Sequence, residues 1–89
     1  LNALSKGMMD RLADIMLEYA ADPKISCITL SGRGERAFCA GGDLRAVYHA
    51  HKKNDFHSLS RLFAREYTYN LRLQALTKPH ISFIHGIVM

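Results

Sequence analysis

An α/β fold is predicted by three features of this 89-residue sequence. Segments with helical spacing of apolar residues alternate with short runs of β-prone residues. Their order is helix, strand, helix, helix, strand, which is expected when a helical crossover joins two parallel strands. The composition, 48% hydrophobic and 22% charged, is close to that of globular domains. We therefore expect residues 1–89 to form one folded unit.

The first helix is predicted to begin after Ser5, whose hydroxyl can accept a free amide of the first turn. It should end near Ala21, because the residue before Pro23 favours extended geometry. A strand over residues 25–30 follows, with Cys27 inside it. The helical spacing of this first segment is carried by Met8, Leu12, Ile15, Met16 and Tyr19.

A glycine-containing loop follows the predicted strand and includes Cys39. The second helix should cover residues 44–51, and a third, longer helix about residues 56–76. Residues 80–84 form the second predicted strand, and Gly86 marks a turn after it. The two strands would then be parallel, joined through the second and third helices.

Both ends of the sequence are typical of interrupted elements. The chain starts with Leu1 rather than methionine, and residues 1–5 are typical of a loop that enters a helix. Residues 81–89 are typical of a strand that stops as it leaves a turn. We therefore expect the unit to be truncated at both ends.

The charge and cysteine content argue against several classes of protein. The formal net charge is +4, but the basic residues are dispersed and their longest run is the pair Lys52-Lys53. This pattern favours a solvated basic surface over nucleic-acid binding. The two cysteines, Cys27 and Cys39, do not form a disulfide framework, so we expect reduced thiols in an intracellular protein. The sequence contains neither a signal peptide nor a run long enough to span a bilayer.

The turn Gly41-Gly42-Asp43 is the first candidate site. Glycines let the backbone approach a ligand closely, and the helix that follows presents free amides to an anion or to a developing oxyanion. An ordinary glycine connection into a helix remains the alternative. The turn is not a Walker loop, because no Gly-Lys-Ser/Thr ending is present. The nearby Gly32 and Gly34 do not form a dinucleotide fingerprint, because Ala37 stands in place of the third glycine and the loop does not run straight into a helix.

Glu66 is the second candidate, because it lies near the centre of an apolar stripe on the third predicted helix. A carboxylate on such a face needs either a cationic partner or a pocket. Arg61 or Arg65 could supply the first, and a ligand pocket would raise the pKa of the carboxyl by desolvation. A helix bent away from the core is the remaining alternative. The five histidines show no zinc-like spacing, and the serines show no nucleophile motif, so we expect neither a metal site nor a serine hydrolase.

Three segments resemble the enoyl-CoA hydratase/isomerase (crotonase) superfamily. Residues 36–44, Arg-Ala-Phe-Cys-Ala-Gly-Gly-Asp-Leu, resemble its signature, and residues 1–5 resemble the segment that leads into its first helix. Residues 78–86 resemble its next strand and turn. Residues 62–70 resemble the corresponding helix of one branch, the 3-hydroxyisobutyryl-CoA hydrolases. The resemblance implies the crotonase (ClpP-like) α/β fold, represented here by the amino-terminal part of its β-β-α superhelix.

The resemblance also implies a role for each matched residue. The backbone amide of Gly42 would be one of two oxyanion donors to the thioester carbonyl, with Gly41 and Asp43 beside the substrate. Glu66 would contact the acyl group, in particular its hydroxyl. Arg65 stands where relatives often carry a second acid. Contacts to the adenine and phosphates of coenzyme A are implied for the loop residues Arg36, Ala37 and Ala40.

The function implied is hydrolysis of the 3-hydroxyisobutyryl-CoA thioester, as in valine breakdown. The second oxyanion donor and the acids that act on water would follow Met89. Losing one donor costs about 10²–10³ in rate, so the piece alone should be nearly inactive. Two alternatives stay open, an enoyl-CoA hydratase or isomerase and a non-catalytic CoA-binding module.

The expected partner is the acyl-CoA substrate, whose coenzyme A is part of the substrate rather than a separate cofactor. No metal, nucleic acid or membrane is expected to bind. Family analogy allows a homo-oligomer. The mitochondrial matrix and the bacterial cytoplasm fit the sequence equally well.

Overall fold

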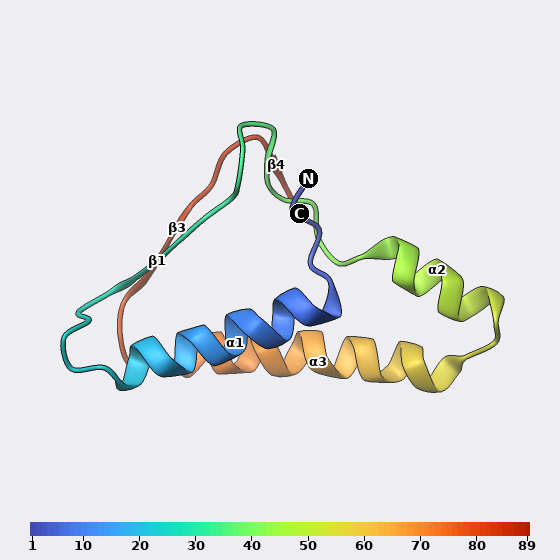
Figure 1. The fold of residues 1–89 in the computed structure, drawn as a ribbon, viewed down its shortest axis with the longest axis horizontal. Helices are drawn as coiled ribbons and strands as arrows, with labels where there is room; N and C mark the ends of the chain where they lie inside the picture. Colours follow the sequence, from blue (N-terminus) through green and yellow to red (C-terminus); the bar gives the residue numbers. More distant parts are fainter.

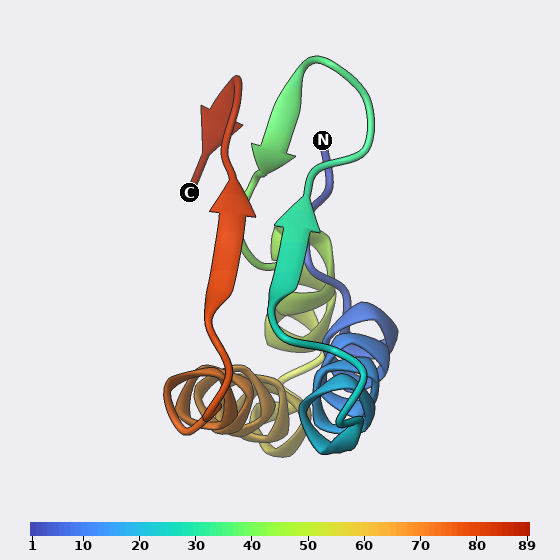
Figure 2. The ribbon, with the colours of Figure 1, turned by 90° about the vertical axis from the view of Figure 1, so that its left-hand side faces the viewer.

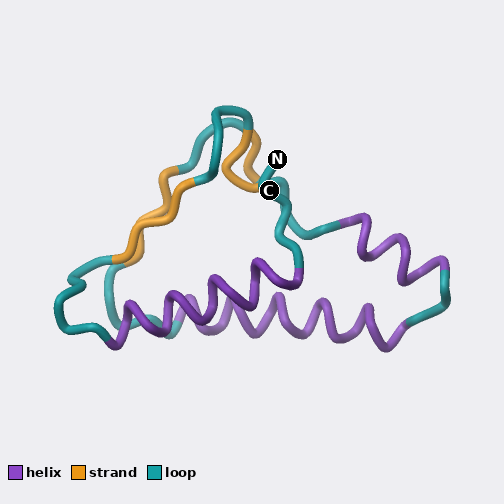
Figure 3. Tube along the Cα trace, in the orientation of Figure 1, coloured by secondary structure: helices purple, strands orange, loops and turns teal.

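The computed structural model describes all 89 residues, and Figure 1 shows two long helices lying side by side beneath a narrow arch of strands. The remaining helix, which is shorter and comes second in the chain, projects beyond one end of this pair. Figure 3 marks the same elements by type. In chain order the elements are α1 (Lys6–Ala21), β1 (Ile28–Ser31), β2 (Ala37–Cys39), α2 (Leu44–Lys52), α3 (Phe56–Gln74), β3 (His80–Phe83) and β4 (Ile87–Val88).

The helix starts follow from side-chain caps. Ser5, Asp43 and Asp55 each accept a backbone N–H from the first turn of α1, α2 and α3 respectively. The Ser58 hydroxyl also donates to Asp55 (2.6 Å), and this bond together with that from the Ser58 amide lowers the pKa of the Asp55 carboxyl. The predicted starts of the first two helices are confirmed, and α3 ends at Gln74, slightly before its predicted end.

The strands form two parallel pairs, one following the other along the arch. In the first pair Ile28 of β1 lies opposite His80 of β3. In the second, Ala37 of β2 lies opposite Ile87 of β4, with an irregularity before Cys39. Figure 2 shows the β2–β4 pair beyond the carboxyl ends of β1 and β3. The predicted parallel arrangement with a helical crossover is therefore confirmed.

The predicted strand over residues 25–30 is wrong at its start. The carbonyl of Asp22 accepts the N–H of Ile25 (3.1 Å), so the chain is still turning at that point. Pairing begins only at Ile28, and Cys27 lies exposed before the strand rather than inside it. The apolar run made the strand look longer than the turn after α1 allows.

The assignment of Cys39 to a loop is also wrong, because this residue ends β2. Its carbonyl accepts the N–H of Met89 (2.9 Å), and the carbonyl of His85 accepts the N–H of Phe38 (2.9 Å). These bonds join segments far apart in the chain, and the short segment 37–39 has no alternating pattern that would predict a strand.

The core lies between α1 and α3. Ala13, Met16 and Tyr69 form its buried cluster, with Leu12, Leu30, Leu73 and Leu76 packed around it. Asp10 of α1 and Arg65 of α3 form an ion pair that fastens the two helices together near the start of α1. The residues of β3 and β4 are all exposed, so backbone hydrogen bonds contribute most to holding these strands.

None of the three helices has the length and apolarity needed to cross a bilayer. Both cysteines are free thiols, Cys27 exposed and Cys39 half-buried. Two segments distant in sequence meet below the top of the arch, where the Ala40 N–H donates to the Leu1 carbonyl (3.0 Å). The Met89 N–H donates to the Cys39 carbonyl (2.9 Å), so both chain ends bond to the segment directly before the candidate glycine turn.

Candidate functional site

The turn between β2 and α2 is held by the segment that precedes α1. The Leu4 N–H donates to the Gly41 carbonyl (2.8 Å), and the Asp43 N–H donates to the Leu4 carbonyl (3.1 Å). Gly41 has φ of 86°, a conformation that side chains rarely tolerate, and its N–H faces the Cys39 sulfur at 3.3 Å. The amides of Gly41 and Asp43 are thus both engaged within the protein.

The Gly42 amide, between them, makes no hydrogen bond in the structure. The next helix satisfies its own first turn, since the Asp43 carboxylate accepts the N–H of Arg45 (3.0 Å) and of Ala46 (3.4 Å). A free amide beside a helix start can donate to an anion or to an oxygen that gains negative charge. Of the three amides in the turn, that of Gly42 is thus the one left without a partner inside the protein.

Glu66 of α3 faces the same turn. Its Oε2 lies 3.8 Å from the position that a Cβ would take on Gly42. Both residues line a cavity of about 240 Å³ that contains no basic side chain. The apolar part of its lining consists of Leu4, Met9, Leu44, Val47, Leu62 and Phe63. The carboxylate therefore sits at the edge of a largely apolar space, next to an unbonded amide.

Neither basic neighbour neutralises Glu66. Arg65 forms its ion pair with Asp10 across the α1–α3 contact, and Arg61 forms none. Glu66 thus lines a cavity and takes no part in a structural ion pair. The negative charge of Glu66 thus remains available to a ligand in the cavity.

Tyr69 lies one turn further along α3 and is buried in the core. Burial raises the pKa of its hydroxyl, and electrostatic interaction with Cys39 adds to the increase. Tyr69 belongs to the core cluster and does not line the cavity shared by Gly42 and Glu66.

The family model of enoyl-CoA hydratase/isomerase matches residues 1–89, the whole chain. The chain belongs to the enoyl-CoA hydratase/isomerase family. Among curated relatives it is 42% identical to the mitochondrial 3-hydroxyisobutyryl-CoA hydrolase of Bos taurus and 38% identical to 3-hydroxyisobutyryl-CoA hydrolase 1 of Arabidopsis thaliana. Both matches cover 100% of this chain and 23% of the relative, so the chain spans about a quarter of their length.

Solved structures of the same family confirm the crotonase fold. A carnitinyl-CoA dehydratase from Mycobacterium thermoresistibile superposes with a TM-score of 0.89 at 36% identity, covering 98% of this chain and 25% of that one. An enoyl-CoA hydratase from Rhodobacter sphaeroides superposes with a TM-score of 0.86 at 28% identity, covering 94% and 25%. The names of these relatives are those of enzymes that act on CoA thioesters. Their similarity supports the conclusion that this chain is part of an enzyme.

The structure of this family member brings some of the predicted site residues together and not others. Gly42, Asp43 and Glu66 line one cavity, and Gly41 lies behind it with its amide and carbonyl engaged. The predicted CoA-contact residues lie outside that cavity, in the loop that leads into the turn and in β2. Arg36 is exposed, Ala37 is 1% exposed and Ala40 is half-buried.

Asn2 holds the loop that leads into the candidate turn, a role that the sequence did not predict. Its Nδ2 donates to the carbonyls of Arg33 (3.0 Å) and Ala37 (2.8 Å), so one side chain ties both ends of the loop that carries Arg36. Its φ of 56° is left-handed, a conformation that asparagine tolerates better than most residues. An asparagine just before a helical segment was the available signal, but its partners are far away in sequence.

The substitution Asn2→Asp should loosen this loop. Aspartate matches the shape of asparagine but cannot donate, and its charge would face two carbonyls. Losing two hydrogen bonds at about 0.5–1.5 kcal/mol each should speed amide hydrogen exchange over residues 33–40 several-fold. Asn2→Gly, which keeps the left-handed φ, should speed exchange less. Unchanged protection in Asn2→Asp would show that the two bonds do not hold the loop.

Proposed function

We propose that the full-length protein hydrolyses the thioester of 3-hydroxyisobutyryl-CoA, the reaction of valine breakdown. In this proposal the present chain supplies one oxyanion donor and the contact to the substrate hydroxyl. The observation that carries it is that the unbonded Gly42 amide and the Glu66 carboxylate lie on one cavity, with Glu66 Oε2 3.8 Å from the position a Cβ would take on Gly42. An amide donor and a carboxylate acceptor suit a substrate with a carbonyl at one end and a hydroxyl at the other.

The chemistry assigns different substrate groups to the two residues. In hydrolysis, water adds to the thioester carbon, the carbonyl oxygen gains negative charge, and the C–S bond breaks to release coenzyme A and the free acid. The Gly42 N–H stabilises that oxygen by hydrogen bonding. Glu66 repels an oxyanion, so it is better matched to the hydroxyl, which donates to a carboxylate. The apolar lining around both groups strengthens these interactions by limiting water.

The coenzyme A contacts and the intracellular setting of the proposed reaction rest on the family relationship rather than on the geometry of the cavity. The loop around Arg36, Ala37 and Ala40 would hold the adenine and phosphates of coenzyme A, mainly through backbone atoms. The exposure of Arg36 supports a phosphate contact, whereas Ala37 is buried and can contribute only through the shape of the loop. The mitochondrial relatives in Bos taurus and Danio rerio support an intracellular setting for the reaction.

The test is to supply the full-length protein with 3-hydroxyisobutyryl-CoA and follow the release of free thiol. A parallel reaction contains an unsaturated enoyl-CoA, and loss of its conjugated absorbance reports hydration. We expect thiol release from the first substrate and little hydration of the second. Hydration without thiol release would replace the proposal with a hydratase, and CoA binding without either reaction would replace it with a non-catalytic module.

A further inference from the structure

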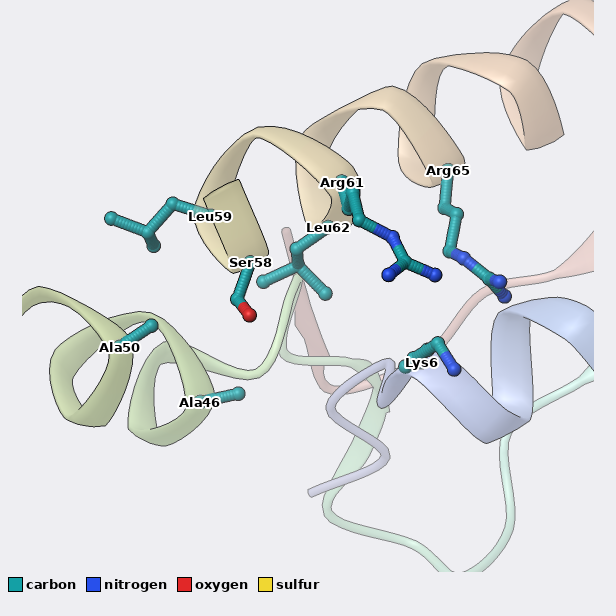
Figure 4. Close-up of a pocket in the computed structure, with 8 residues that line it drawn as sticks. All are labelled: Lys6, Ala46, Ala50, Ser58, Leu59, Arg61, Leu62 and Arg65. Atoms are coloured by element: carbon teal, nitrogen blue, oxygen red, sulfur yellow. The ribbon is translucent and has the colours of Figure 1, made fainter. Parts of the chain in front are cut away.

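A second cavity lies on the other side of Leu62 from the Glu66 cavity, and basic side chains dominate its polar lining. Its volume is about 320 Å³, and it lies between the start of α1, the α2 helix and the first half of α3. Lys6 reaches it from α1, and Arg61 and Arg65 reach it from α3. Figure 4 shows the two guanidinium groups extending from α3 toward the side on which Lys6 lies.

The charges around this cavity are not balanced. Arg65 is paired with Asp10, whereas Lys6 and Arg61 form no ion pair. No acidic side chain lines the cavity. Two positive charges are therefore left without a counter-charge at one site, where their mutual repulsion would be relieved by an anion.

The Asp10 contact also orders part of this basic group. The carboxylate binds a single terminal nitrogen of Arg65, Nη1, through both of its oxygens. The other guanidinium N–H groups of Arg65 remain free to donate. Asp10 thus fixes the position of Arg65 without using up its capacity to bind a second anion.

The opposite wall of the cavity is apolar. It consists of Ala46 and Ala50 of α2 together with Leu59 and Leu62 of α3. Figure 4 shows the two alanines and Leu62 on the side away from the basic groups. The cavity therefore matches a small molecule with an anionic end and an apolar end, rather than a bare ion.

We propose that this cavity is a binding site for a small organic phosphate. The phosphate would lie among Lys6, Arg61 and the free N–H groups of Arg65, since guanidinium groups match phosphate oxygens in geometry and charge. The apolar part of the ligand would lie against α2. This site uses neither Gly42 nor Glu66, so it stands independently of the proposed hydrolase activity.

A ligand in this position would bridge all three helices. It would contact α3, which carries Glu66, and α2, which begins directly after the Gly42 turn. Because a ligand that binds only the folded state stabilises it by mass action, occupancy should raise the melting temperature of the protein. The melting temperature is thus a second readout that does not depend on thioester turnover.

The experiment is isothermal titration of the full-length protein with phenyl phosphate, alongside inorganic phosphate and phenol. We expect saturable binding of phenyl phosphate, weaker binding of inorganic phosphate, and no displacement by saturating acyl-CoA. Arg61→Gln and Lys6→Gln should each weaken phenyl phosphate binding by about tenfold, as for loss of a charged hydrogen bond. The matched control Arg11→Gln removes an exposed charge from α1 outside the cavity and should leave binding unchanged.

Three outcomes would overturn the proposal. Equal weakening in Arg11→Gln would indicate a diffuse attraction by the basic surface rather than a site. Equal affinities for phenyl phosphate and inorganic phosphate would remove the role of the apolar wall. Displacement of the probe by acyl-CoA would mean that it binds the coenzyme A site, even if thioester hydrolysis itself is confirmed.

Discussion

Replacing Gly42 by valine should lower thioester turnover by the full-length protein about 10²–10³-fold, the cost of losing one oxyanion donor. A Cβ added to Gly42 would lie 3.8 Å from the Glu66 Oε2, and the two methyl groups of valine would occupy part of the cavity that both residues line. The substrate carbonyl would then be unable to approach the Gly42 N–H. The measurement is kcat from free-thiol release, with folding checked by the melting temperature.

Gly42→Ala is the matched control for this substitution. Its Cβ would make an ordinary van der Waals contact and leave most of the cavity open. Alanine should therefore retain much more activity than valine. A valine variant with wild-type kcat would place the oxyanion donor elsewhere, and an alanine variant as inactive as valine would point to a distorted turn instead of a blocked amide.

Helix boundaries could be predicted from the sequence because their causes are local. Ser5 and Asp43 cap helices within a few residues of their own position, and Pro23 follows the end of α1 closely. The strands depend on partners far away in the chain. The start of β1 is set by the turn at Asp22, and β2 exists as a strand because β4 pairs with it, so neither could be located from apolar runs alone.

The candidate site shows the same division. The position of Glu66 on an apolar stripe was enough to predict that it needs a partner or a pocket. Helical spacing could not say which, because the partner of Arg65 turned out to be Asp10 on another helix. The free Gly42 amide is likewise defined by what its neighbours bind, and the Leu4 segment that binds them is far away in sequence.

Replacing Glu66 by alanine should reduce kcat/KM for 3-hydroxyisobutyryl-CoA about 10–100-fold, as expected for a lost hydrogen bond to a charged group. The same substitution should change kcat/KM for isobutyryl-CoA far less, since that substrate lacks the hydroxyl. Glu66→Gln keeps an acceptor oxygen of similar reach and should fall between the wild type and alanine. The two substrates are compared in the same free-thiol assay.

The ratio of the losses in kcat/KM for 3-hydroxyisobutyryl-CoA and isobutyryl-CoA is the decisive quantity. It separates recognition of the hydroxyl from general damage to the site. Glu66 is half-buried and forms no ion pair, so removing its charge should leave the α1–α3 contact, held by Asp10 and Arg65, in place. A structural defect would therefore have to come from the cavity itself and would lower turnover of both substrates alike. Equal losses would contradict the assignment of Glu66 to the substrate hydroxyl, whereas a selective loss would separate its role from that of the Gly42 amide, which both substrates need.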